Sequence, residues 1–224
     1  MMPGRFILGV GTGEKLNEHI LGDRWPPAPV RLEMLEEAVD IIRLLWEGET
    51  KDYYGVFYIV ENARIYTLPE QLPPMMIAAS GMESAKTAAK IGDGLITTGS
   101  SQEIIELFKN SGGEGKPVYS EFTTCWAKTE EVAKRIAYDM WPIAANRGEL
   151  NQELPTPTHF EQLAGMVSPK DVVKNMPIGP DPQRYIEEIN KFTQAGADHI
   201  CLHQVGPNQP EFIQFIKEKV LPEF

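Results

Sequence analysis

Short continuous runs of apolar residues alternate with longer amphipathic segments along most of the chain. A helix is predicted after each run, because hydrophobic residues then recur every three or four positions. Five strand and helix repeats in this order predict an α/β fold with parallel strands joined by right-handed crossovers. The runs that predict buried strands are residues 5–11, 75–79, 95–98, 118–126 and 199–205.

Two segments depart from this alternation. Residues 53–60 and 63–68 alternate weakly around Glu61-Asn62 and predict an irregular hairpin rich in tyrosine. Residues 148–180 predict an insertion with short helical pieces at best, because five prolines interrupt them: Pro155, Pro157, Pro169, Pro177 and Pro180. No linker or repeat divides the chain, which predicts one domain over residues 1–224.

Two architectures fit the order of the elements. A doubly wound parallel sheet is one, and a (β/α) barrel is the other, favoured by the insertion before the last unit and by polar residues directly after the strands. Five units do not close an eight-stranded barrel, which takes about 250 residues. The pattern alone therefore leaves both open.

Composition narrows the possible partners. The formal net charge is −11 at pH 7 and the sequence pI is about 4.9, which disfavours a nucleic-acid groove. No apolar run is long enough to predict a membrane span, and the start lacks a signal-peptide pattern, so a cytoplasmic protein is expected. Cys125 and Cys201 are predicted to be buried free thiols, because each lies alone in an apolar run.

Candidate chemistry gathers where the predicted strands end, since ligands bind there in α/β folds. Glu14 follows the first strand and is a general acid or base or a solvated loop carboxylate. Asn17 is a ligand contact or, more simply, a turn residue. Residues 80–84 join a strand to a helix, so they either hold a phosphate at free backbone N–H groups or form an ordinary helix cap at Ser80.

Other binding motifs are weak. Gly9, Gly11 and Gly13 do not give the spacing of a dinucleotide fingerprint, and no helix follows them directly. The four histidines are dispersed, although His199 and His203 are four apart and on the same side of a strand. We therefore predict no metal site.

Five segments spread along the chain carry a family resemblance: Gly4–Glu18, Arg31–Ala38, Ile77–Gly81, Ile91–Thr98 and Ala195–Ile200. Together they resemble the bacterial-luciferase-like superfamily. Within it they resemble the branch of coenzyme F-420 (deazaflavin)-dependent oxidoreductases that includes glucose-6-phosphate dehydrogenases. The likeness covers essentially the whole chain.

The resemblance implies a (β/α)8 TIM barrel of which this sequence covers about strands 4 to 8, with 148–180 as an insertion before the last strand. The first three units of the family, with the histidine and tryptophan that flank the cofactor ring, then lie outside it. The resemblance also implies that Glu14 is the catalytic acid–base group. It implies that the cofactor is bound by Thr12, Gly13, Asn17, Ser80, Gly81, Glu83 and Ser84.

For the substrate, the resemblance implies contacts from Thr98 and Lys174. A second lysine expected three residues after that threonine is replaced by Ser101, which argues against glucose 6-phosphate. A small alcohol or carbonyl compound is expected instead. The alternatives are a flavin mononucleotide (FMN)-dependent luciferase-like monooxygenase, and a non-catalytic barrel fragment that needs a partner. A homo-oligomer is expected because an open parallel sheet exposes an apolar edge.

Overall fold

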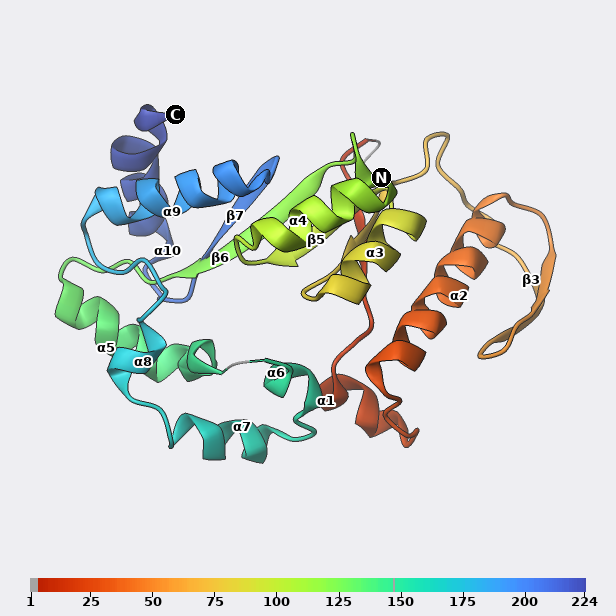
Figure 1. The fold of residues 1–224 in the computed structure, drawn as a ribbon, viewed down its shortest axis with the longest axis horizontal. Coiled ribbons are helices and arrows are strands. Elements are labelled where there is room, and N and C mark those ends of the chain that lie inside the picture. The colour runs from red at the N-terminus through yellow and green to blue at the C-terminus, as the bar shows by residue number, and fades with distance from the viewer. Residues whose placement is uncertain (1–3, 147) are drawn as a thin grey trace. The chain divides into compact units, whose positions relative to one another are not determined.

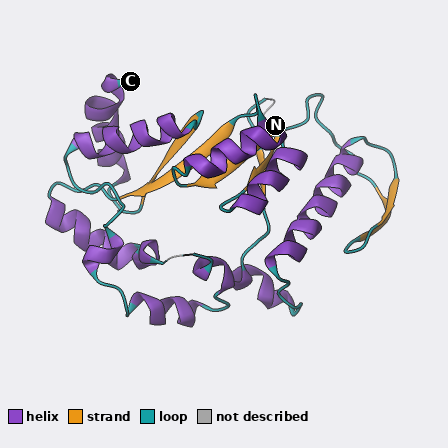
Figure 2. Ribbon diagram, in the orientation of Figure 1, coloured by secondary structure: helices purple, strands orange, loops and turns teal. Residues whose placement is uncertain are grey.

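The computed structural model describes residues 4–146 and 148–224 (Figure 1). It divides into two compact units. The first comprises the chain up to Thr12, Pro26–Thr97 and Ser101–Val118, and the second comprises the described residues of Gly13–Trp25, Thr98–Ser100 and Tyr119–Phe224. Both contain parallel strands and helices, so the predicted α/β class is confirmed (Figure 2).

Three parallel strands form the centre of the first unit. They are β1 (Leu8–Val10), β4 (Met75–Ala78) and β5 (Gly94–Thr98), and β4 pairs with both others. The strands are short and apolar, and Met75, Ile77 and Leu95 have no exposed surface. Burial on this scale drives the packing of the helices around them: α2 (Ala28–Trp46), α3 (Met82–Ile91) and α4 (Gln102–Phe108).

The tyrosine-rich hairpin consists of β2 (Lys51–Tyr54) and β3 (Ile59–Ala63) and lies along α2 (Figure 1). Its turn is at residues 55–58, so the prediction of a turn at Glu61-Asn62 was wrong. The physical reason is Glu37 of α2, whose carboxylate accepts the backbone N–H groups of Val56, Phe57 and Tyr58 at 2.7–3.2 Å. Gly55 makes this possible, because a Cβ there would lie 1.9 Å from Glu37 Oε1.

Removing the Glu37 carboxylate is expected to release the turn from α2. In Glu37→Ala we expect the rate of amide hydrogen exchange at residues 56–58 to rise by about tenfold or more. Each hydrogen bond to the charged carboxylate stabilises the closed turn by about 1.5 kcal/mol in the parent chain, and the variant loses these bonds. Exchange measured by NMR checks this. Glu33→Gln is the matched control, an exposed carboxylate on the same helix. Equal protection in Glu37→Ala and the parent chain would contradict the assignment.

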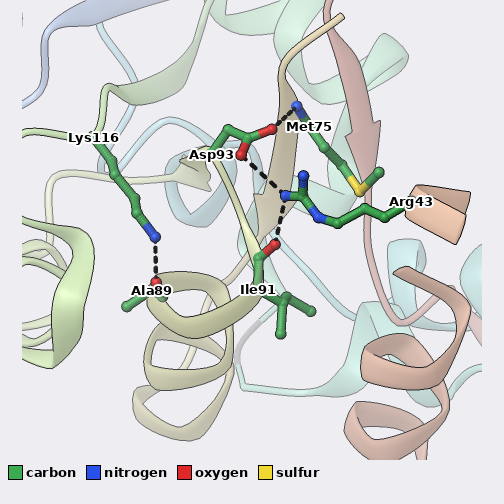
Figure 3. Close-up of polar contacts among 6 residues, drawn as sticks. All are labelled: Arg43, Met75, Ala89, Ile91, Asp93 and Lys116. Carbon is green, nitrogen blue, oxygen red and sulfur yellow. Dashed lines mark hydrogen bonds and ion pairs between the residues drawn. The ribbon is translucent and has the colours of Figure 1, made fainter. Parts of the chain in front are cut away.

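A network of hydrogen bonds and one ion pair lies in the first unit, where β4 and β5 begin (Figure 3). Asp93 accepts the Met75 N–H at 2.8 Å and an Arg43 N–H at 3.0 Å, and its own N–H donates to the Met75 carbonyl. Arg43 also donates to the Ile91 carbonyl at 2.9 Å, and Lys116 donates to the Ala89 carbonyl at 2.6 Å. Two cations thus satisfy carbonyls at the C-terminus of α3, where the helix dipole favours positive charge.

In the second unit, β6 (Val118–Thr124) pairs in parallel with β7 (His199–Gln204). The surrounding helices are α5 (Glu130–Met140), α9 (Pro182–Ala195) and α10 (Gln209–Phe215). The Thr129 hydroxyl caps α5, and Gly196 ends α9 in the left-handed conformation. Tyr185 is fully buried against the rings of Phe212 and Phe215. Its hydroxyl donates to the Gly179 carbonyl at 2.8 Å. This aromatic cluster packs the helices of the unit together.

Residues 148–180 contain three short helices, α6 (Leu150–Glu153), α7 (Pro157–Ala164) and α8 (Pro169–Val172). The end of the segment is not a loop. Ile178 forms a parallel bridge with Cys125, next to the end of β6, and residues 176–179 are buried. The predicted insertion therefore contributes a short paired segment to the second unit.

The two cysteines differ. Cys125 is buried, as predicted, and burial raises the pKa of its thiol to about 11. Cys201 is exposed, so the prediction that it is buried was wrong. The reason is the alternation of β7, which turns Cys201 toward the strand face that also carries His199. Among the described residues, no helix is long and apolar enough to cross a membrane.

Candidate cofactor and substrate site

The residues predicted to form the site fall in both units. Thr12, Ser80, Gly81, Glu83 and Ser84 belong to the first unit, and Gly13, Glu14, Asn17, Thr98 and Lys174 belong to the second. The two groups are described separately.

Glu14 stands at the start of a short helix, α1 (Lys15–Glu18). The chain turns into it at Gly13, whose φ of +76° suits glycine. The Glu14 carbonyl accepts the N–H groups of Asn17 and Glu18, and the Asn17 amide lies 3.5 Å from Glu14 Oε2. Both side chains are exposed. Asn17 therefore lies in α1 with its side-chain amide next to the Glu14 carboxylate.

Residues 80–84 form the junction between β4 and α3. The helix cap is Gly81, not Ser80: the Ser84 hydroxyl accepts the Gly81 N–H at 3.1 Å and donates to the Gly81 carbonyl at 3.0 Å. The first backbone N–H groups of a helix have no partner within the helix, so they face outward at this junction. Glu83 lies in the first turn and is paired with Lys86 at 2.7 Å, which offsets its charge. The junction can bind an anion through its backbone.

Thr98 and Lys174 are both exposed in the second unit. Thr98 ends β5, and the N–H of the next residue, Gly99, donates to the Glu121 carbonyl of β6 at 3.2 Å. Lys174 follows α8, and its backbone N–H donates to the backbone carbonyl of Asp171. Within the described chain no hydrogen bond or ion pair joins the Lys174 ammonium to Thr98.

Sequence reasoning placed His199 and His203 on one side of a strand but missed the β6 side chains that lie beside them on the same face. His203 Nδ1 lies 3.9 Å from a Glu121 carboxylate oxygen and 3.5 Å from the Thr123 hydroxyl. The ring of Trp141 meets the His203 ring edge-on, with centroids 4.8 Å apart. The signal was the spacing of two between Tyr119, Glu121 and Thr123 along β6. It is hidden because the buried face of the strand also carries polar residues, Ser120 and Thr124.

His199, on the same face, stacks on Tyr119 with ring centroids 4.1 Å apart instead of turning toward His203. Within residues 4–146 and 148–224, no three or more histidine, cysteine, aspartate or glutamate side chains lie close enough together to hold a metal ion. The chemistry of this face therefore rests on one histidine and its neighbours.

Comparison with known proteins identifies relatives over nearly the whole chain. The family model described as "Luciferase-like monooxygenase" matches residues 1–199. The "F420-dependent glucose-6-phosphate dehydrogenase" of Microbacterium testaceum is 32% identical over 238 residues, covering 99% of this chain and 69% of the relative. The enzyme of the same name from Amycolatopsis mediterranei is also 32% identical and covers 98% of this chain and 70% of its own.

Solved structures agree with this relationship. An "F420-dependent secondary alcohol dehydrogenase" in complex with an F420–acetone adduct superposes with a TM-score of 0.87 at 25% identity, over 99% of this chain and 70% of its own. A coenzyme F420-dependent tetrahydromethanopterin reductase from Methanopyrus kandleri has a TM-score of 0.72 at 20% identity, over 99% of this chain and 75% of its own. The second likeness concerns the fold alone.

Proposed function

The chain belongs to the luciferase-like monooxygenase family, and from this membership we propose that it transfers a hydride between coenzyme F-420 and a small alcohol or carbonyl substrate. The observation that carries the proposal is the combined match to relatives named as F420-dependent dehydrogenases and to a solved F420-dependent secondary alcohol dehydrogenase. By the same relationship, we propose that the chain supplies about strands 4 to 8 of a (β/α)8 barrel.

The residues of the β4–α3 junction suit a phosphate-bearing cofactor. The outward N–H groups at the start of α3 supply donors for an anion, and the Glu83–Lys86 pair removes a repelling charge. The proposed cofactor contacts are Thr12, Gly13, Asn17, Ser80, Gly81, Glu83 and Ser84.

The proposed mechanism divides the work between cofactor and protein. The deazaflavin ring supplies hydride chemistry when bound, and the protein aligns the reactants and handles the proton of the substrate hydroxyl. Glu14 is the proposed acid–base group. Its backbone enters α1 through the turn at Gly13, and the Asn17 amide lies 3.5 Å from its carboxylate.

An uncharged substrate is favoured over glucose 6-phosphate. A dianionic phosphate is normally held by several cations, but Ser101 stands where the family resemblance leads us to expect a lysine. Lys174 remains as a cation in the second unit, exposed after α8. The proposed substrate contacts are thus Thr98 and Lys174, with a small alcohol or carbonyl compound as the substrate.

Other solved neighbours keep a second cofactor open. Structures of monooxygenases that match at 14–17% identity support the family fold, and one of them contains FMN.

We also propose that the protein forms homo-oligomers, because β1 stands at the edge of its sheet and the adjoining Phe6 and Ile7 are 54% and 40% exposed.

Parallel titrations with oxidised coenzyme F-420 and with FMN test the cofactor. We expect saturable quenching of deazaflavin fluorescence and weaker or no binding of FMN. The helix-start site predicts that inorganic phosphate competes with F-420, whereas an equal concentration of a monovalent chloride salt competes less. Tighter binding of FMN would favour the monooxygenase alternative, and binding of neither would favour the non-catalytic fragment.

A further inference from the structure

One face of β6 and β7 carries chemically active side chains instead of apolar ones. Along β6, Val118, Ser120, Phe122 and Thr124 are buried, whereas the residues between them are half-buried. Parallel register sets each of those beside a β7 residue on the same face. The face therefore consists of Tyr119, Glu121, Thr123, His199, Cys201 and His203.

His203 is held in one orientation near the carboxyl end of β7. The Thr123 hydroxyl and the Glu121 carboxylate both lie on its Nδ1 side, at 3.5 and 3.9 Å. Trp141 supports the ring from another side, with an interplanar angle of 80°. The His203 side chain keeps 33% of its surface exposed. In the part of the chain that the structure describes, no hydrogen bond engages its Nε2, which is available to a ligand.

We infer that His203 Nε2 binds the hydroxyl or carbonyl oxygen of an uncharged substrate, with Glu121 and Thr123 as positioning residues; the inference rests on the proposed function. Two properties of imidazole support it. With Nδ1–H directed toward the acidic side, neutral Nε2 accepts a hydrogen bond from an alcohol, and when it is protonated it donates one to a carbonyl oxygen. Alcohol and carbonyl are the two forms that a hydride-transfer enzyme interconverts.

The charge of the face gives its selectivity. Glu121 is the acidic member, and none of the six residues is lysine or arginine. A sugar phosphate brought to His203 would meet the Glu121 carboxylate without a nearby cation on this face to offset it. The structure therefore favours a neutral alcohol over glucose 6-phosphate at His203, independently of the replacement at Ser101.

Histidine NMR tests this directly on the full chain. We expect 2-propanol to shift the His203 imidazole resonances saturably and glucose 6-phosphate to leave them unchanged. His203→Gln assigns the signal and should remove the response. His199→Gln is the matched control, since it changes the stacked histidine on the same strand face and should leave the response intact. Glu121→Gln should keep the ring in place but reduce the preference for the alcohol.

Enzyme kinetics give a second readout. In His203→Gln we expect the KM for 2-propanol to rise by about tenfold, the value of one hydrogen bond, with unchanged affinity for coenzyme F-420. A purely structural role would instead weaken both. Shifts with glucose 6-phosphate as large as those with 2-propanol would overturn the inference, as would no response to either.

The two proposals fail separately. Binding of coenzyme F-420 without any response of His203 to 2-propanol would overturn the role of His203 and leave the proposed function standing. A response of His203 without binding of F-420 would support the substrate site and overturn the cofactor assignment.

Discussion

Asp93→Ala is expected to lower the free energy of unfolding by about 2–4 kcal/mol, a large effect for one partly exposed carboxylate. The main contribution is the Met75 N–H, which donates to Asp93 at 2.8 Å from a residue with no exposed surface. A buried N–H that is left without an acceptor lowers the stability of the folded state by about 1–3 kcal/mol. The ion pair with Arg43 adds less, because both side chains are about 40% exposed and screened by water.

Chemical denaturation of the parent and variants measures this effect. Asp93→Asn keeps an oxygen for the Met75 N–H but loses the charge, so we expect it to cost only about 1 kcal/mol. Asp139→Ala removes an exposed aspartate at the end of α5 and serves as the control. If Asp93→Ala and Asp93→Asn were equally destabilised, the charge pair with Arg43 would be the dominant interaction and the buried-donor argument would be wrong.

The elements that could be predicted from the sequence are those whose signals are local. α9 (Pro182–Ala195) is one of the helices predicted between the apolar runs, and Gly196 ends it in the left-handed conformation. The buried strand at Met75 has an apolar run with a junction after it, and it was also predicted. Local propensity and tertiary packing agree at these positions.

The hairpin turn could not be predicted in the same way. Its position depends on Glu37, which lies about 20 residues before the turn and binds it through three backbone N–H groups. The residues at Glu61-Asn62 look like a turn, and Asn62 does take a positive φ of 52°, but it belongs to β3. A contact between distant residues therefore overrides the local turn signal.

Only part of the candidate site could be predicted from the sequence, for a related reason. The β4–α3 junction follows from the order of elements, and the sequence located it, although the cap is Gly81. His203 needs the pairing of β6 with β7, which sets Thr123 opposite it. Strand register joins residues 80 positions apart and has no signature in one sequence. The catalytic assignment of Glu14 came from the resemblance and stays a prediction.

Glu14→Gln is expected to lower turnover with 2-propanol by about 100-fold, since a positioned acid–base group contributes about 10²–10⁴. Glutamine keeps the size of the side chain and an oxygen that can accept from the Asn17 amide, which lies 3.5 Å away in the parent. The turn at Gly13 depends on backbone contacts and should persist. The variant therefore removes proton transfer and leaves the loop in place.

Turnover is best followed by the loss of oxidised deazaflavin absorbance, both in the chain itself and in a fusion that adds the part of the Microbacterium testaceum relative that this chain does not cover. Glu18→Gln is the matched control, because this exposed carboxylate lies on the same short helix. Unchanged turnover in Glu14→Gln would remove Glu14 from proton transfer. A parallel loss of coenzyme F-420 affinity would make it a binding residue instead. A loss confined to turnover fits only a group that acts on the substrate proton, because a binding defect would appear in the titration.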